Sequence, residues 1–312
     1  MQALPRCTRP LHAPVLHQKH INRIQTPIAF PAYRWTRSFH ASASIELAFD
    51  LHDNGGKATG APILILHGLF GSKRNNRSIS KALARDLSRP VYALDLRNHG
   101  DSTHDKEHNY TALAKDTEAF LKQHDLKDAT LIGHSMGAKT VMTMALRDPN
   151  CCANIIAVDN APVDAALLSD FPRYVEGMRR VEAKGVQSQK EADQILEPFA
   201  KELPVRQFLL TNLVRPGPNE PYKFKIPVHI LANALGNLGD FPFKDPDATR
   251  FNKRALFVRG TRSPYVIDEM IPIIGRFFPR FEMVDVESGH WVISENPEAF
   301  KRAVVEFLQD SE

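Results

Sequence analysis

The sequence predicts an α/β fold in which a mostly parallel, doubly wound sheet is interrupted by an inserted helical segment. Short apolar runs such as 63–66 and 154–158 alternate with amphipathic stretches along most of the chain. Runs this short and this apolar are typical of parallel strands that are buried on both faces. The alternation stops between Asp159 and Arg254, where nearly all the local signals are helical. Alternating strands and helices indicate right-handed crossovers within one sheet.

Each expected strand is an apolar run bounded by proline, glycine or polar residues. The expected strands are 63–66, 91–94, 129–132, 154–158, 255–258 and 281–286. Helical periodicity fills the intervals, and proline marks two of the boundaries: Asp148-Pro149 ends one helix and Asn296-Pro297 begins the last. The expected core helices are 78–88, 110–124, 136–147, 266–277 and 297–309.

The segment 163–250 is predicted to be a helical lid inserted into a core formed by residues 46–162 and 251–312. Its helical stretches are separated by residues that break helices, including Gly185 and Pro204. The expected lid helices are 164–184, 188–202, 204–214 and 226–238.

The composition is that of an ordinary globular chain. Of the 312 residues, 43% are hydrophobic and 24% are charged, which excludes a collagen-like, coiled-coil or wholly disordered chain. No apolar run approaches the roughly 18 residues that a transmembrane helix requires. Three cysteines cannot form a disulfide framework, and no His or Cys lies near them at zinc-binding spacing. The sequence shows no cluster of His and Asp ligands, so no metal is expected, and no other cofactor is expected.

Residues 1–45 differ from the rest of the chain because they contain six basic residues and no acidic one. Removing these six from the 40 Lys and Arg leaves 34 against 36 Asp and Glu, and this balance argues against a nucleic-acid-binding protein. Acid-free leaders that contain Arg and Ser are typical of mitochondrial transit peptides. The segment 37–42 also resembles the Arg-x-Phe-x-x-Ser pattern of matrix presequences. We therefore expect a mitochondrial matrix protein; the alternative is a disordered tail without a targeting role.

Gly133-His134-Ser135-Met136-Gly137 is the strongest local signal in the sequence. It follows an apolar strand and precedes a helix, which is the context in which Gly-x-Ser-x-Gly forms a nucleophile elbow. Side chains at the two glycine positions would collide with the adjacent strand and helix. The turn lifts the Ser135 hydroxyl to the carboxyl edge of the sheet, where α/β proteins bind ligands. Ser135 is therefore the candidate nucleophile; the alternative is a Gly-Ser turn without chemistry.

A serine nucleophile needs a base, and the base needs a carboxylate that orients it. His290 is the candidate base, because its loop follows the last strand and reaches the same sheet edge as Ser135. Asp159 is the candidate acid, because it directly follows the strand 154–158. Asp268 is the alternative acid, although it comes after the next helix has begun. Three other loop histidines are expected to be structural: His67, His99 and His134.

The backbone N–H groups of Leu69 and Met136 are expected to form an oxyanion hole. Leu69 lies in the His-Gly-Leu-Phe-Gly segment 67–71, which follows the first apolar strand as the His-Gly motifs of esterases do. Fixed donors at these positions would stabilise the transition state by roughly 3–4 kcal/mol each.

Together these segments resemble the α/β-hydrolase superfamily, and more closely its mitochondrial branch, which includes fungal ethanol acetyltransferases, their animal relatives and small bacterial esterases. The similarity covers about residues 46–310. Asp-x-Ala-Pro-Val at 159–163 is more discriminating than the widespread Gly-His-Ser-Met-Gly. In that branch the acid follows the strand after the elbow, in agreement with Asp159. One departure is Ala138-Lys139, where Gly-Lys is expected. The matching stretches are 66–73, 95–102, 133–139, 158–163 and 289–292.

The resemblance implies serine-dependent acyl transfer through an acyl-enzyme, with hydrolysis of short-chain esters or acyl thioesters. One alternative is acetyl transfer to an alcohol such as ethanol, with acetyl-CoA as a substrate rather than a cofactor. An alternative of another class is a catalytically silent hydrolase fold that binds ligands. We expect a small-molecule acyl ester or acyl-CoA as the partner. Five basic residues could either meet CoA phosphates or be scattered surface charges: Lys73, Arg74, Arg77, Arg173 and Arg179.

The mature chain is expected to start near Ser44, after import and cleavage of the leader. Intact mass and N-terminal sequencing of protein recovered from mitochondria should show that Met1 and the basic leader are gone. Recovery of a tagged chain from the cytosol with Met1 intact would contradict this prediction.

Overall fold

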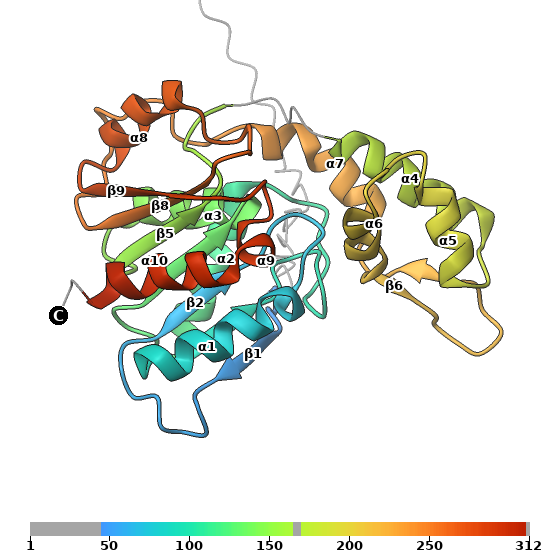
Figure 1. Cartoon of the computed structure of the whole chain (residues 1–312), viewed down its shortest axis with the longest axis horizontal. Coiled ribbons are helices and arrows are strands. Elements are labelled where there is room, and N and C mark those ends of the chain that lie inside the picture. The colour runs from blue at the N-terminus through green and yellow to red at the C-terminus, as the bar shows by residue number, and fades with distance from the viewer. Residues whose placement is uncertain (1–44, 165–169, 310–312) are drawn as a thin grey trace, which may run out of the picture. The chain divides into compact units, whose positions relative to one another are not determined.

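A computed structural model of the chain describes residues 45–164 and 170–309 (Figure 1). Residues 1–44 of the expected leader therefore lie outside the described residues. The main sheet has seven strands, in the spatial order β1-β3-β2-β4-β5-β8-β9, and all neighbours are parallel except β1 and β3. The strands are β1 (Phe49–His52), β2 (Ile63–Leu66), β3 (Val91–Leu94), β4 (Thr130–His134), β5 (Asn154–Val158), β8 (Ala255–Gly260) and β9 (Phe281–Val286).

Helices cover both faces of this sheet. Successive side chains of a strand point to opposite faces, and the packing follows this alternation: Ile63 and Ile65 of β2 pack with residues of α1 and α10, whereas Leu64 and Leu66 pack with residues of α2, α3 and α8. The sheet is therefore doubly wound. The core helices are α1 (Arg77–Leu87), α2 (Tyr110–Gln123), α3 (Met136–Arg147), α8 (Ile271–Phe277), α9 (Val292–Glu295) and α10 (Pro297–Gln309). The short helices η1 (Lys73–Asn76) and η2 (Asp268–Met270) precede α1 and α8.

The carboxyl ends of β4, β5 and β8 are tied to one another by backbone hydrogen bonds that continue beyond the strands. The N–H of Ser135 donates to the carbonyl oxygen of Val158 at 2.9 Å, and the N–H of Asp159 donates to that of Val258 at 2.8 Å. Because the strands are parallel, the loops that follow them meet at one edge of the sheet.

The predicted lid segment, residues 163–250, forms a second group of elements between β5 and β8. In Figure 1, α4, α5 and α6 lie beside one another in this group. The elements are α4 (Phe171–Lys184), α5 (Gln189–Leu196), α6 (Leu203–Leu210), β6 (Leu213–Val214), β7 (Lys223–Phe224) and α7 (Val228–Gly239). β6 and β7 form an antiparallel two-stranded sheet.

The structure differs from the sequence-based expectations at several helix ends. The helix expected over 188–202 ends at Leu196, because Pro198 has no N–H with which to continue the helical hydrogen bonds. The helix expected over 204–214 ends at Leu210, because the chain then enters the β6–β7 hairpin, which was not predicted. The helix expected over 266–277 is shorter and comprises η2 and α8.

The edge strand β1 was also not predicted. Its residues pair antiparallel with β3, and Leu51 stays 44% exposed. A short edge strand that is buried on neither face lacks the continuous apolar run by which the other strands were recognised. Among the described residues, none of the helices combines the length and apolar character needed to span a lipid bilayer.

Candidate active site

The backbone at Ser135 makes an abrupt turn between β4 and α3. Its φ of 55° and ψ of −110° place a residue with a side chain in a region that favours glycine. The hydrogen bond from its N–H to Val158 holds the turn against β5, and the Asn160 side-chain amide donates to its carbonyl oxygen at 3.2 Å. Strain of this kind persists only where the surrounding structure holds it, and it is concentrated at functional sites.

The two elbow glycines are sterically required. A Cβ atom on Gly133 would lie 2.1 Å from the carbonyl oxygen of Gly137, and one on Gly137 would lie 2.4 Å from that of Leu66. Neither of these backbone atoms can move without displacing a strand or the start of α3. A side chain at either glycine position would therefore collide with neighbouring backbone, as the sequence predicts.

The three residues singled out in the sequence form one hydrogen-bonded chain. His290 Nε2 lies 3.0 Å from Ser135 Oγ, and His290 Nδ1 lies 2.6 Å from Asp159 Oδ2. An ionised carboxylate only accepts hydrogen bonds, so the imidazole proton is on Nδ1 and Nε2 accepts from the serine hydroxyl. This is the arrangement in which a histidine can take the serine proton.

Asp159 is fully buried, and three groups donate to its carboxylate. Besides His290, the N–H of Gly260 donates to Oδ1 at 3.0 Å, and the Ser263 hydroxyl donates to Oδ2. A buried carboxylate without such donors would be costly. Asp268, the alternative acid, is remote from this chain of bonds: its side chain is 80% exposed and pairs with Arg259.

Sequence reasoning did not identify Ser263 or Tyr265. The loop after β8 contains no acidic residue before Asp268, but it supplies a hydroxyl to Asp159 and an aromatic ring to His290. The Tyr265 ring stacks on the His290 imidazole, with centroids 4.0 Å apart and planes 21° apart. The position of both residues directly after a strand, at the carboxyl edge of the sheet, is the signal that could have identified them.

The loop 67–71 packs against the nucleophile. A Cβ atom on Gly68 would lie 3.3 Å from Ser135 Cβ. The hydrogen bonds among the described residues leave the N–H groups of Leu69 and Met136 without a protein acceptor. Both are therefore available to a ligand, as the expected oxyanion hole requires.

His67 and His99 shape this loop as internal hydrogen-bonding groups. His67 Nδ1 donates to the Gly68 carbonyl at 2.8 Å, and its Nε2 accepts from the N–H of Leu96. His99 Nδ1 donates to the Arg97 carbonyl, and its Nε2 accepts from the N–H of Phe70 at 3.1 Å. His134 Nε2 donates to the His290 carbonyl at 2.7 Å.

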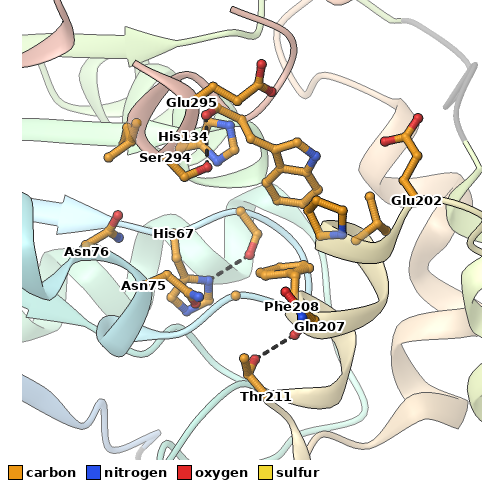
Figure 2. A pocket seen from close by; sticks show the side chains of 16 residues that line it. His67, Asn75, Asn76, His134, Glu202, Gln207, Phe208, Thr211, Ser294 and Glu295 are labelled. Atoms are coloured by element: carbon orange, nitrogen blue, oxygen red, sulfur yellow. Dashed lines mark hydrogen bonds between the residues drawn. The ribbon is translucent and has the colours of Figure 1, made fainter. Parts of the chain in front are cut away.

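A pocket of about 560 Å³ adjoins the hydrogen-bonded chain (Figure 2). Gly68, His134 and Trp291, which are adjacent in sequence to Leu69, Ser135 and His290, are among its lining residues. Figure 2 shows Gln207, Phe208 and Thr211 of α6 and its C-terminal end facing the loop that carries His67. The Trp291 and Phe208 rings meet at a centroid distance of 4.6 Å, so a core residue next to His290 contacts the lid segment directly.

The polar lining of the pocket is neutral or acidic. It includes Glu202, Glu295 and the side chains of Asn75 and Gln207, and there is no Lys or Arg among its lining residues. Lys73, one of the cations considered for CoA phosphates, is buried and bonded to Asp95 at 2.6 Å and to Asp101 at 2.5 Å. Its charge is therefore already neutralised. Across residues 45–164 and 170–309, no three His, Cys, Asp or Glu side chains are grouped as metal ligands.

Burial lowers the pKa of four histidines in and beneath these loops. The pKa falls to about 4 for His134 and to about 3 for His108, and it is also lowered for His67 and His99. Desolvation of the charged imidazole is the largest cause in each case. These rings therefore remain neutral while they donate and accept the hydrogen bonds of the loops.

These lowered pKa values predict acid sensitivity. Below the ordinary histidine pKa of 6.5, these histidines bind protons in the unfolded chain but not in the folded chain. Their contribution to the free energy of unfolding is therefore fully present above pH 6.5, and the free energy of unfolding declines as the pH falls to about 5. Each histidine contributes a slope of up to about 1.4 kcal/mol per pH unit. Urea unfolding across this range measures the slope.

His108→Gln is the matched variant for this experiment. It removes one titrating ring but retains an acceptor for the Asn98 side chain. The slope of the free energy of unfolding against pH should therefore decrease by the contribution of one bound proton. A free energy of unfolding that stays constant from pH 6.5 to about 5 would contradict the prediction.

Comparisons with known proteins agree with this architecture. A family model described as the alpha/beta hydrolase fold matches residues 61–297. The probable alcohol acetyltransferase of Saccharomyces cerevisiae is 37% identical over 88% of this chain and 89% of that protein. The sn-1-specific diacylglycerol lipase ABHD11 of Xenopus tropicalis is 37% identical over 88% of this chain and 86% of that protein. A solved marine microorganism esterase is 30% identical with a TM-score of 0.77, covering 85% of this chain and 100% of that one.

These matches confirm the predicted fold class and the resemblance to α/β hydrolases. The family model spans more than half of the chain, and two relatives above 30% identity each cover 88% of it. The chain belongs to the α/β-hydrolase fold family.

Proposed function

We propose that the protein is a serine hydrolase that cleaves small, neutral carboxylic esters through an acyl-enzyme. The observation that carries this proposal is the hydrogen-bonded chain Ser135–His290–Asp159, beside the N–H groups of Leu69 and Met136, for which the described part of the chain supplies no acceptor. Membership of a family whose relatives are named as esterases, lipases and acetyltransferases supports an enzyme of this class.

The first half-reaction forms the acyl-enzyme. Ser135 Oγ attacks the acyl carbon while His290 Nε2 takes the hydroxyl proton, and Asp159 stabilises the resulting imidazolium. The N–H groups of Leu69 and Met136 bind the oxygen that becomes negative. When the tetrahedral intermediate collapses, His290 returns the proton to the departing alcohol or thiol. Ser135 is then bonded to the acyl group and the base is neutral again.

The second half-reaction repeats these steps with water as the nucleophile. His290 takes a proton from the water that attacks the acyl carbon, and it returns that proton to Ser135 Oγ as the acid departs. An alcohol in place of water would give an ester instead, with the same proton transfers. The partition between the two acceptors depends on how well the pocket excludes water.

The chemistry of the pocket favours an uncharged substrate. Glu202 and Glu295 lie in its lining, which contains no Lys or Arg. Glu295 pairs with Arg262 at 3.3 Å, so the phosphates of a CoA thioester would meet the Glu202 carboxylate rather than a cationic partner. The aromatic pair Trp291–Phe208 offers an apolar surface to an acyl or alkyl chain. A neutral ester therefore fits this lining better than an acyl-CoA.

Acetyl transfer from acetyl-CoA to an alcohol is the second candidate function. It is supported by the 37% identity to the probable alcohol acetyltransferase of Saccharomyces cerevisiae. We also propose a mitochondrial location, which is supported by the acid-free basic leader alone.

Asp159→Asn should lower kcat by roughly 10⁴-fold with little loss of stability. The new amide would accept from Gly260 and would turn its NH₂ group toward His290 Nδ1. The imidazole proton would then move to Nε2, where it blocks acceptance from Ser135. Steady-state hydrolysis of p-nitrophenyl acetate and the thermal midpoint together test this prediction.

Asp268→Asn is the control, because it removes an exposed carboxylate that pairs with Arg259. It should leave kcat within about twofold of the parent value, as loss of a surface ion pair costs little. If Asp268→Asn abolished turnover and Asp159→Asn did not, the assignment of the acid would be wrong.

Purified protein given acetyl-CoA or a neutral acetate ester, each with and without ethanol, separates the candidate functions. We expect free acetate from the neutral ester as the main product, and labelling of Ser135 by a fluorophosphonate that Ser135→Ala abolishes. Ethyl acetate as the main product would favour the acetyltransferase. Absence of both labelling and turnover would indicate a silent fold.

A further inference from the structure

The backbone of Phe70 is held in a conformation that it would not adopt by itself. Its φ of 63° lies in the left-handed region, which a bulky side chain disfavours. The Leu69–Phe70 peptide joins this turn to Leu69, whose N–H is an expected oxyanion donor, so the turn at Phe70 restricts the backbone of Leu69. The surrounding structure must supply the contacts that hold this turn.

The core holds the turn from one side. The N–H of Phe70 donates to His99 Nε2 at 3.1 Å, and the other ring nitrogen of His99 is held by the Arg97 carbonyl at 2.9 Å. His99 is fully buried and neutral, so this acceptor is fixed in place. The Phe70 ring is fully buried as well.

The lid segment holds the same residue from the other side. The side-chain Nδ2 of Asn212 donates to the Phe70 carbonyl oxygen at 2.8 Å, across 142 residues of sequence. Asn212 is 5% exposed and lies between α6 and β6. The Phe70 ring also meets Phe171 of α4 edge to face, at a centroid distance of 5.8 Å. The Phe70 N–H thus has its partner in the core, and the Phe70 carbonyl oxygen has its partner in the lid segment.

Asn212 is itself tightly bound within the lid segment. Its N–H donates to the Leu209 carbonyl at 3.1 Å, and its carbonyl accepts from the N–H of Lys225 at 2.8 Å. The Lys225 side chain in turn pairs with Asp101, which also binds Lys73. A displacement of the end of α6 therefore has to be transmitted to Asn212 and through its amide to Phe70.

We propose that Asn212 is a positioning residue that couples the lid segment to the oxyanion hole. By holding the Phe70 carbonyl it orients the Leu69 N–H toward the acyl oxygen, and a shift of α6 would weaken transition-state binding without touching Ser135, His290 or Asp159. The inference rests on the proposed serine mechanism. It concerns the rate of acyl transfer rather than substrate affinity.

The test compares Asn212→Leu with the parent enzyme on p-nitrophenyl acetate, after titration of active sites with a fluorophosphonate. Titration counts only folded, reactive Ser135, so partial misfolding cannot imitate the effect. We expect kcat per titrated site to fall by about tenfold or more, less than complete loss of an oxyanion donor, while KM stays within about twofold. Affinity for a trifluoromethyl ketone, whose adduct carries the oxyanion, should fall by the same factor as kcat.

Asn237→Leu is the matched control. Asn237 of α7 also donates its side-chain amide to a core carbonyl, that of His108 at 3.3 Å, but not to a residue of the 67–71 loop. It should leave kcat and KM per titrated site unchanged. An Asn212→Leu enzyme with parental kcat per titrated site would overturn the coupling, as would an equal loss in Asn237→Leu. Parent protein that neither labels nor hydrolyses ester would refute the proposed mechanism, and the coupling with it.

Discussion

The site depends on one strained turn of backbone, at Ser135. A left-handed residue with a side chain is tolerated there because Gly133 lets β4 approach the start of α3, and Gly137 lets α3 approach the end of β2. The Ser135 N–H also continues the bonding of β4 to β5. The same continuation ties Asp159, also left-handed at φ 53°, to β8. The ends of β4 and β5 thus hold the Ser135 hydroxyl and the Asp159 carboxylate at a separation set by the sheet. The His290 imidazole lies between the two groups and forms a hydrogen bond with each.

Buried polar groups around this turn are satisfied almost entirely by one another. The Asp159 carboxylate receives a ring N–H, a backbone N–H and a hydroxyl, while His67 and His99 each use both ring nitrogens within the loops. Such networks stabilise a single arrangement, because a buried donor or acceptor without a hydrogen-bond partner in a low dielectric raises the free energy of the folded state. Among the described residues, the N–H groups of Leu69 and Met136 have no acceptor, and a preorganised site for a developing negative charge has this property.

The lid segment contributes to the site at two levels. Through Phe208 it lines a pocket next to His290, and through Asn212 it reaches the loop behind the nucleophile. The first contact bears on which substrate is accepted and the second on how well the transition state is stabilised. A helical insertion that touches both could alter substrate choice and transition-state binding without a change in Ser135, His290 or Asp159. The acidic lining near Glu202 illustrates the first level, since it disfavours anionic substrates.

Local sequence determined the order of the elements, six of the seven strands of the main sheet, and the candidates Ser135 and His290, because each of these is encoded by a short apolar run or a steric motif. It also ranked Asp159 above Asp268 from its place after a strand. Only the tertiary structure placed Asp159 against His290 and Asp268 against Arg259, and only it revealed Ser263 and Asn212. Hydrogen bonds between residues more than 100 positions apart depend on how strands and helices pack and on where each side chain then points. The direction of a side chain in the folded protein cannot be read from periodicity or spacing along the chain. The edge strand β1 and the β6–β7 hairpin escaped prediction for a related reason: their stability comes from pairing with a neighbour rather than from their own residues.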